Sequence, residues 1–213
     1  MTDSKHYDKK YFMWQQSMGK IGTVLNKFKF ENHINSTDVL MDFGCGGGYL
    51  LTAFKNKIKI GFEINHSCWD ECNKNNITVV DNYDDIDDGY IDCVISDHAL
   101  EHVTLPLQTL KDLHKKIKTN GKLVIVIPCE QPSEAAFYYK EGDINQHLHT
   151  WCPMTLGNLV TLAGFKVVSC MPFQHQWCPD FKENYNKPDF HDRCIAYAKK
   201  NKNLQIKLIA IKP

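Results

Sequence analysis

The chain has 213 residues, enough for one domain with a substantial core and too few for two independent domains. Its 25 basic residues balance its 25 acidic residues, so no overall field attracts a polyanion, and we do not expect nucleic acid as a partner. The apolar runs are shorter than the roughly 20 residues of a membrane span, and we find no secretory signal at the start of the sequence. The nine cysteines form no C-x-x-C pair, which favours reduced thiols over a disulfide framework. We therefore expect a cytoplasmic protein without a membrane partner.

Short β-rich apolar runs alternate with segments of helical length. The runs cover residues 39–43, 58–62, 77–80, 91–96 and 123–127. This alternation predicts a parallel sheet with crossover helices. Two further runs, at 165–171 and 204–211, predict final strands, and the polar stretch between them, PDFKENYNKPDFHDR, predicts a long loop.

Two segments have the apolar spacing of an amphipathic helix. Residues 11–30 precede the first strand, and we interpret them as a helix that packs on the core rather than as a substrate lid. The second segment, 100–118, is followed by Asn120-Gly121, which predicts a helix stop before the next buried strand.

A glycine-rich turn follows the first predicted strand. The sequence VLMDFGCGGGYL, Val39 to Leu50, joins a buried strand, an acid, a glycine loop and the start of a helical pattern. Glycines let the backbone approach a ligand closely, and a helix N-terminus offers free N–H groups to an anionic group. A dinucleotide fingerprint would need glycine where Tyr49 stands, which disfavours a nicotinamide cofactor. The pattern D-x-G-x-G-x-G, from Asp42 to Gly48, instead resembles motif I of the class I S-adenosylmethionine-dependent methyltransferases.

Acids after the next strands extend this resemblance. Glu63 comes about twenty residues after the loop, where a carboxylate can accept both ribose hydroxyls. In the resembling family, the positions of Asp81 and Asn82 hold the adenine edge, and the end of the fourth strand, here Asp97, lies near the methionine part. The cofactor-binding residues expected for S-adenosylmethionine are Asp42, Gly44, Cys45, Gly46, Gly48, Glu63, Ile64, Asp81, Asn82 and Asp97.

The resemblance implies a fold as well as a cofactor. We expect a Rossmann-like, doubly wound α/β sheet of seven strands, mostly parallel, with the last strand antiparallel. A single methyltransferase domain would span 1–213, with an N-terminal helical cap at 1–35 and the Rossmann-like core at 36–213.

Histidines gather after the fourth predicted strand. His98, Glu101 and His102 form H-x-x-E-H, whose spacing would place all three side chains on one face of a helix. An aliphatic hydroxyl is a weak acid, and a divalent metal can both acidify and orient it. Imidazole and carboxylate ligands suit manganese, iron, cobalt or zinc, with magnesium as a further candidate.

The H-x-x-E-H sequence resembles the E-x-x-E-H of metal-dependent methyltransferases that modify the 2′-hydroxyl at the 3′ end of small RNAs. Those enzymes carry a later histidine four residues before a tryptophan, as His147 precedes Trp151 here, but His98 replaces their first glutamate. The implied metal ligands are His98, Glu101, His102 and His147, with His149 as an alternate. Without a metal, His98 or His147 would be the catalytic base, since an imidazole titrates near neutral pH.

The sequence thus predicts an O-methyltransferase that acts on a hydroxyl of a sugar, glycan or other polyhydroxylated small acceptor, with a divalent metal as a candidate cofactor. Three alternatives stay open: an RNA 3′-terminal 2′-O-methyltransferase, a metal-free small-molecule methyltransferase acting on nitrogen, carbon or a phenol, and a non-catalytic binding module. The sequence leaves the oligomeric state open.

Overall fold

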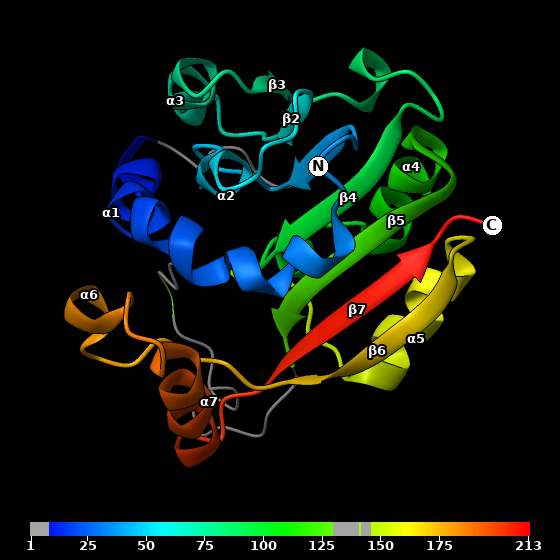
Figure 1. Ribbon diagram of the computed structural model, residues 1–213. Helices are drawn as coiled ribbons and strands as arrows, with labels where there is room; N and C mark the ends of the chain where they lie inside the picture. Colours follow the sequence, from blue (N-terminus) through cyan, green and yellow to red (C-terminus); the bar gives the residue numbers. More distant parts are fainter. Residues whose placement is uncertain (1–8, 130–140, 142–145) are drawn as a thin grey trace.

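The predicted apolar runs form the strands of one sheet. These are β1 (Leu40–Phe43), β2 (Lys59–Phe62), β3 (Thr78–Val80), β4 (Ile91–Asp97), β5 (Ile117–Pro128), β6 (Lys166–Phe173) and β7 (Gln205–Ile211). In the computed structural model, which describes residues 9–129, 141 and 146–213, the strand order is β3-β2-β1-β4-β5-β7-β6 (Figure 1). The first five strands in this order are parallel to one another, whereas β7 is antiparallel to both of its neighbours, β5 and β6. The predicted doubly wound α/β fold is confirmed.

Helices cover both faces of the sheet. They are α1 (Lys9–Asn26), α2 (Tyr49–Thr52), α3 (Trp69–Lys74), α4 (Pro106–Lys116), α5 (Pro153–Leu162), α6 (Phe181–Asn184) and α7 (Phe190–Lys200). Helices α4 and α5 pack on one face, and α1 and α2 lie on the other (Figure 1). Because neighbouring residues of a strand point to opposite faces, Val94 joins the core beneath α4 and α5, while Cys93 and Ile95 join the core beneath α2.

The segment predicted as one helix over 100–118 is divided. A 3₁₀ turn forms at Leu100–His102, and α4 starts at Pro106, where a residue without an N–H is tolerated. Strand β5 begins directly after α4, so the prediction of a helix stop at Asn120-Gly121 is wrong. Asn120 instead has a φ of 63° inside β5, beside the shift in pairing register between Ile91 and Cys93 of β4.

The loop predicted between β6 and β7 is wrong as well, because α6 and α7 occupy it. Helix α7 buries Phe190, Cys194 and Ala198, which recur every fourth residue and face one side of the helix. The polar and charged residues between them hid this spacing in the sequence.

The end of α1 and the turn after it pack on the rest of the chain. Leu25 is buried with Cys178, Phe190 and Cys194, and Phe30 is buried against the sheet core. Residues 1–8 of the predicted cap lie outside the described residues. None of the helices in the described ranges combines the length and apolar character that a membrane crossing requires.

Candidate cofactor and acceptor site

The glycine loop after β1 adopts backbone conformations that favour glycine. Gly44, Gly46 and Gly48 have φ values of 79°, 53° and 73°. A Cβ atom at Gly44 would lie 2.4 Å from the Cβ of Ala99, and one at Gly48 would lie 2.5 Å from Cδ1 of Ile77. The loop therefore needs glycine both for its turns and for its close packing.

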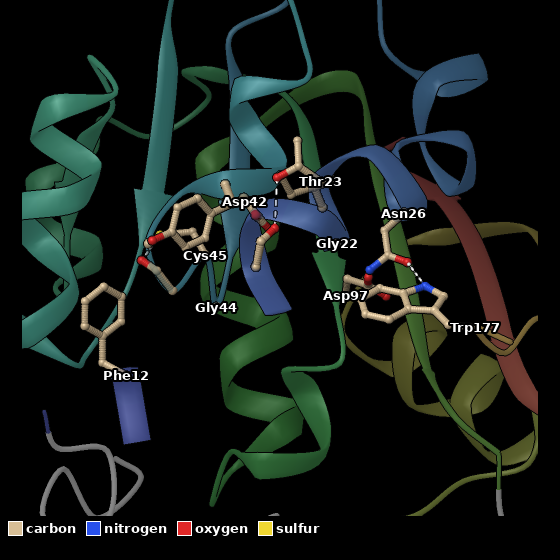
Figure 2. A pocket seen from close by; sticks show the side chains of 14 residues that line it. Phe12, Gly22, Thr23, Asn26, Asp42, Gly44, Cys45, Asp97 and Trp177 are labelled. Carbon is tan, nitrogen blue, oxygen red and sulfur yellow. Dashed lines mark hydrogen bonds between the residues drawn. The ribbon is translucent and has the colours of Figure 1, made fainter. Parts of the chain in front are cut away.

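A cavity of about 210 Å³ lies between this loop and α1 (Figure 2). Its walls are formed by Phe12, Gly19, Gly22, Thr23, Asn26, Asp42, Gly44, Cys45, Gly46, Gly47, Tyr49, Leu50, Asp97 and Trp177. Helix α1 thus forms one wall of the cavity in addition to packing on the core, a role that our interpretation of residues 11–30 omitted.

Two carboxylates, Asp42 and Asp97, face this cavity, and no lysine or arginine is among its described lining residues. Asp42 is 3 % exposed, and its burial, together with the neighbouring Asp97 and Glu63 carboxylates, raises its pKa well above the usual range. A cationic ligand would relieve this repulsion. The cavity therefore suits a positively charged group more than an anion.

Glu63 ties the end of β2 to the glycine loop. Its carboxylate accepts hydrogen bonds from the backbone N–H groups of Gly46, at 2.7 Å, and Asn65, at 2.8 Å. Burial raises the pKa of Glu63, although these hydrogen bonds act in the opposite direction. Ile64 packs against the hydrophobic core. Neither Glu63 nor Ile64 lines the cavity.

Asp81 and Asn82 follow β3, close to the surface and also outside the cavity lining. The Asp81 carboxylate lies 2.6 Å from Nε2 of His66, and both side chains are exposed. The Asn82 side chain accepts a hydrogen bond from the N–H of Asp84. Sequence reasoning missed His66, which precedes Asp81 by fifteen residues.

The turn after β4 brings predicted acceptor-site residues together. His98 has a φ of 57°, so the prediction that one helical face carries His98, Glu101 and His102 is wrong. The tight turn still places Oε1 of Glu101 3.4 Å from Nδ1 of His98 and 3.9 Å from Nε2 of His102. The Glu101 carbonyl accepts hydrogen bonds from the N–H groups of Leu148 and His149, which holds the His147 segment against this turn.

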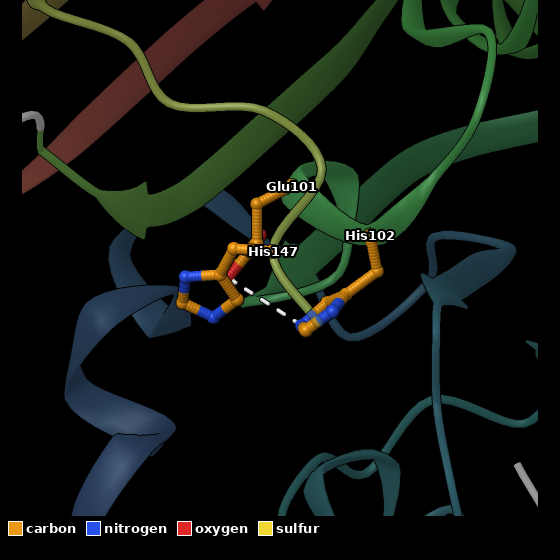
Figure 3. Close-up of side chains that lie close together, drawn as sticks. All are labelled: Glu101, His102 and His147. Carbon is orange, nitrogen blue, oxygen red and sulfur yellow. Dashed lines mark ion pairs between the residues drawn. The ribbon is translucent and has the colours of Figure 1, made fainter. Parts of the chain in front are cut away.

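Three side chains here could share one metal ion. Glu101, His102 and His147 each offer a ligand atom, and these atoms all lie within 4.8 Å of one another (Figure 3). His98 and His149 are not part of this group. His149 stacks on Trp151, with ring centroids 5.5 Å apart, and its buried Nε2 has no hydrogen-bond partner among the described residues.

Glu101 is an unusual carboxylate. Its side chain is 1 % exposed, and neither oxygen is hydrogen-bonded by a described residue. A buried carboxylate is costly unless a cation or a proton compensates it. Desolvation would lower the pKa of His98, but the Glu101 and Asp97 carboxylates outweigh it and raise the pKa. At His102, by contrast, burial prevails and lowers the pKa.

A buried lysine stands behind the cavity, and sequence reasoning missed it. Lys29 is 4 % exposed, and its Nζ lies 2.9 and 3.2 Å from the two carboxylate oxygens of Asp97. The sequence offered no signal for its burial, because a lysine is almost never fully buried unless it is paired.

A histidine pair lies next to this lysine. Nε2 of His175 is 3.1 Å from Nδ1 of His191, and the Phe28 ring contacts both imidazoles. Burial, and then the positive charges of Lys29 and His191, lower the pKa of His175 to about 3. His191 lies on α7, in the segment predicted as a loop, so the pairing had no signal in the sequence.

Comparisons with known proteins identify the family and the fold of the chain. The family model described as "Methyltransferase domain" matches residues 13–170. No curated protein matches the chain significantly. Among solved structures, a possible histamine N-methyltransferase from Thermotoga maritima has 15 % identity and a TM-score of 0.66, with 94 % of each chain covered.

Two further structures have the same fold. A putative methyltransferase from Bacillus halodurans has 17 % identity and a TM-score of 0.65, over 89 % of this chain and 98 % of that one. The geranyl diphosphate C-methyltransferase from Streptomyces coelicolor, solved with Mg²⁺ and S-adenosylhomocysteine, has 15 % identity and a TM-score of 0.65, over 89 % and 77 %. The family match covers most of the chain, which therefore belongs to the methyltransferase domain family and is a class I enzyme with S-adenosylmethionine as its cofactor.

Proposed function

We propose that this enzyme transfers the methyl group of S-adenosylmethionine to a hydroxyl oxygen of a sugar or another polyhydroxylated small acceptor, assisted by a divalent metal. The observation that carries the proposal is the convergence of Glu101, His102 and His147 in the turn after β4. The same turn begins at Asp97, which lines the cofactor cavity, so the methyl donor and the acceptor would meet there.

The cofactor would lie across the carboxyl ends of β1, β2 and β4. In this proposal the glycine loop and Asp97 bind the methionine part, Glu63 accepts the ribose hydroxyls, and Asp81 with Asn82 holds the adenine edge. The carboxylates of Asp42 and Asp97 support this orientation, because the ammonium and sulfonium groups are the cationic parts of the cofactor.

The buried Glu101 carboxylate supports a metal. A divalent ion would compensate its charge, and two imidazoles beside one carboxylate favour manganese, iron, cobalt or zinc over magnesium. Such an ion would lower the pKa of a bound hydroxyl and orient its oxygen for in-line attack. Two adjacent hydroxyls could bind together, which is why a sugar is the preferred acceptor class.

The contact between His98 and Glu101 favours a second candidate, a metal-free methyltransferase. A histidine 3.4 Å from a buried carboxylate is a plausible base with its orienting partner. His98 would then take the acceptor proton directly. Metal dependence separates this candidate from the first.

The deciding experiment measures metal content and activity together. Purified enzyme is analysed by inductively coupled plasma mass spectrometry, and methyl transfer to a panel of sugars and polyols is assayed before chelation, after chelation and after metal is restored. Glu101→Gln and His147→Ala are expected to lose metal and activity. His33→Gln is the matched control, because His33 is not part of the metal-ligand group. Its backbone carbonyl accepts a hydrogen bond from Lys122, which pairs with Cys93 near the start of β4, whereas the metal-ligand group follows the end of β4.

The response of activity to chelation distinguishes the two candidates. Loss of activity on chelation, with recovery on adding manganese or cobalt, supports the metal proposal. Full activity in chelator eliminates it in favour of His98 as the base. Methylation of RNA, with binding that weakens steeply as salt rises, would replace the sugar with a polyanionic acceptor.

A further inference from the structure

Lys29 occupies a place that a lysine rarely has. Its side chain is 5 % exposed, and that of its partner Asp97 is 13 % exposed. The two residues are 68 positions apart in the sequence, and their contact joins the 3₁₀ turn after α1 to the end of β4. Burying such an ion pair costs desolvation free energy, and an apolar side chain of the same size would often stabilise the fold equally well. The lysine therefore has a role beyond packing.

The partner of Lys29 belongs to the wall of the cofactor cavity. Asp97 faces the cavity with Asp42, and Figure 2 shows both among its lining side chains. Lys29 itself is not among the lining residues, so it acts on a ligand through Asp97 and through its field. That field extends further, since Lys29 lowers the pKa of His175 and of Lys207 as a secondary cause after burial.

The reaction changes the charge of the ligand in this cavity. S-adenosylmethionine carries a sulfonium in addition to its amino-acid charges, and transfer of the methyl group leaves S-adenosylhomocysteine, a neutral thioether. A negatively charged wall binds the donor more strongly than the product for this reason alone. A buried cation behind that wall reduces the difference.

We propose that Lys29 is a positioning residue that fixes the Asp97 carboxylate at the cavity wall and, by offsetting its charge, sets how strongly the enzyme prefers the sulfonium cofactor to the thioether product. Lys29 in this way limits how much more tightly the donor is bound than the product. The inference concerns the cofactor alone, so it requires neither the metal nor the sugar of the proposed function.

The test is a ratio of two dissociation constants. Isothermal titration calorimetry with S-adenosylmethionine and with S-adenosylhomocysteine gives the product-to-donor ratio for the wild type and each variant. Lys29→Met is expected to raise this ratio by about fivefold or more, because one positive charge near the sulfonium is lost. Asp97→Asn is expected to lower the ratio, and Lys29→Arg, which keeps the charge, is expected to leave it within about twofold.

Lys27→Met is the matched control. Lys27 lies two residues away and pairs with Glu31 at the surface, with 44 % of its side chain exposed, so its loss should leave the ratio unchanged. Thermal unfolding of each variant checks that it is folded. If Lys29→Met does not fold, Asp97→Asn still tests the proposal, because a lowered ratio supports it and an unchanged ratio overturns it.

A purely structural role predicts a different pattern. Loss of a brace would weaken both ligands by the same factor and leave the ratio constant. A constant ratio in Lys29→Met, or an unchanged ratio in Asp97→Asn, would overturn the proposal. Either result would leave the metal and acceptor experiments untouched.

Discussion

The N–H of Gly46 donates a hydrogen bond of 2.7 Å to the carboxylate of Glu63, so a side chain at the end of β2 holds the loop that follows β1. The other carboxylate oxygen accepts the N–H of Asn65. The acid that we expect to bind the ribose therefore also sets the shape of the glycine loop, and its two functions are linked.

Replacing Glu63 by glutamine should damage both functions. The amide oxygen can accept only one of the two backbone hydrogen bonds, and the amide nitrogen would face a donor. We expect a loss of about 1–2 kcal/mol in the free energy of unfolding and at least roughly a tenfold loss of cofactor affinity. Urea unfolding and calorimetry measure these effects. Glu183 is exposed, so Glu183→Gln is the control. If Glu63→Gln binds the cofactor with wild-type affinity, the two functions of Glu63 are not linked.

Asp42→Asn should stabilise the cofactor-free enzyme while weakening cofactor binding. The pKa of Asp42 is raised in the fold, so above its ordinary value of 3.8 the unfolded chain loses this proton first, and stability falls as pH rises. Asparagine removes that penalty, which we expect to be roughly 1–2 kcal/mol near neutral pH. The lost charge should reduce S-adenosylmethionine affinity about tenfold. Thermal melts should show a higher midpoint for the variant without cofactor and a smaller rise of that midpoint when cofactor is added; a less stable variant without cofactor would contradict the prediction.

A methyl group at Gly19 should loosen the wall that α1 forms. The new Cβ would lie 2.3 Å from the Tyr49 ring, which also lies against Gly47. We expect Gly19→Ala to raise the cofactor dissociation constant by roughly fivefold or more, although alanine is favoured in helices by about 1 kcal/mol. In the control, Gly157→Ala in α5, the new Cβ meets nothing closer than 4.0 Å, so that variant should gain stability. Unchanged binding in Gly19→Ala would show that α1 does not need to approach this closely.

The pKa of His175 predicts a loss of stability in acid. Its pKa falls from 6.5 to about 3 in the fold, so on acidification the unfolded chain gains a proton that the folded chain resists until about pH 3. Stability is therefore full above pH 6.5 and declines below it, with a slope from this residue approaching about 1.4 kcal/mol per pH unit. His175→Gln should flatten the profile of unfolding free energy between pH 6.5 and 4. Parallel profiles for variant and wild type would contradict this assignment.

The strands and the cofactor loop could be predicted because their signals are local. Buried strands require continuous apolar runs, and the backbone conformations at Gly44, Gly46 and Gly48 favour glycine. Helix α7 could not be predicted, because only Phe190, Cys194 and Ala198 are buried and the residues between them are mostly polar or charged. The helix stop predicted at Asn120 was wrong because the left-handed conformation that often ends a helix also occurs in β-bulges.

The residue types of the candidate site could be proposed from the sequence, but their pairings could not. Glu101 and His102 adjoin in sequence, and the four-residue spacing of His147 and Trp151 pointed to a partner. The contact of Lys29 with Asp97, and that of His175 with His191, depends on distant segments meeting in space. No local pattern encodes such contacts, and the first of them puts a buried positive charge beside the Asp97 carboxylate of the cavity wall.

The excursion between β6 and β7 reaches from the far edge of the sheet back to the cavity beside α1. Phe173 and Gln205 are paired across these strands, so the chain leaves the sheet and re-enters it at one point. The free-energy cost of closing such an excursion grows slowly with its length, so the pairing of β6 with β7 tolerates a segment of this size. Residues 174–204 place Trp177 in the cavity wall and pack against Leu25 of α1, so replacing this segment would remodel the methyl-donor cavity while β6 and β7 stay paired.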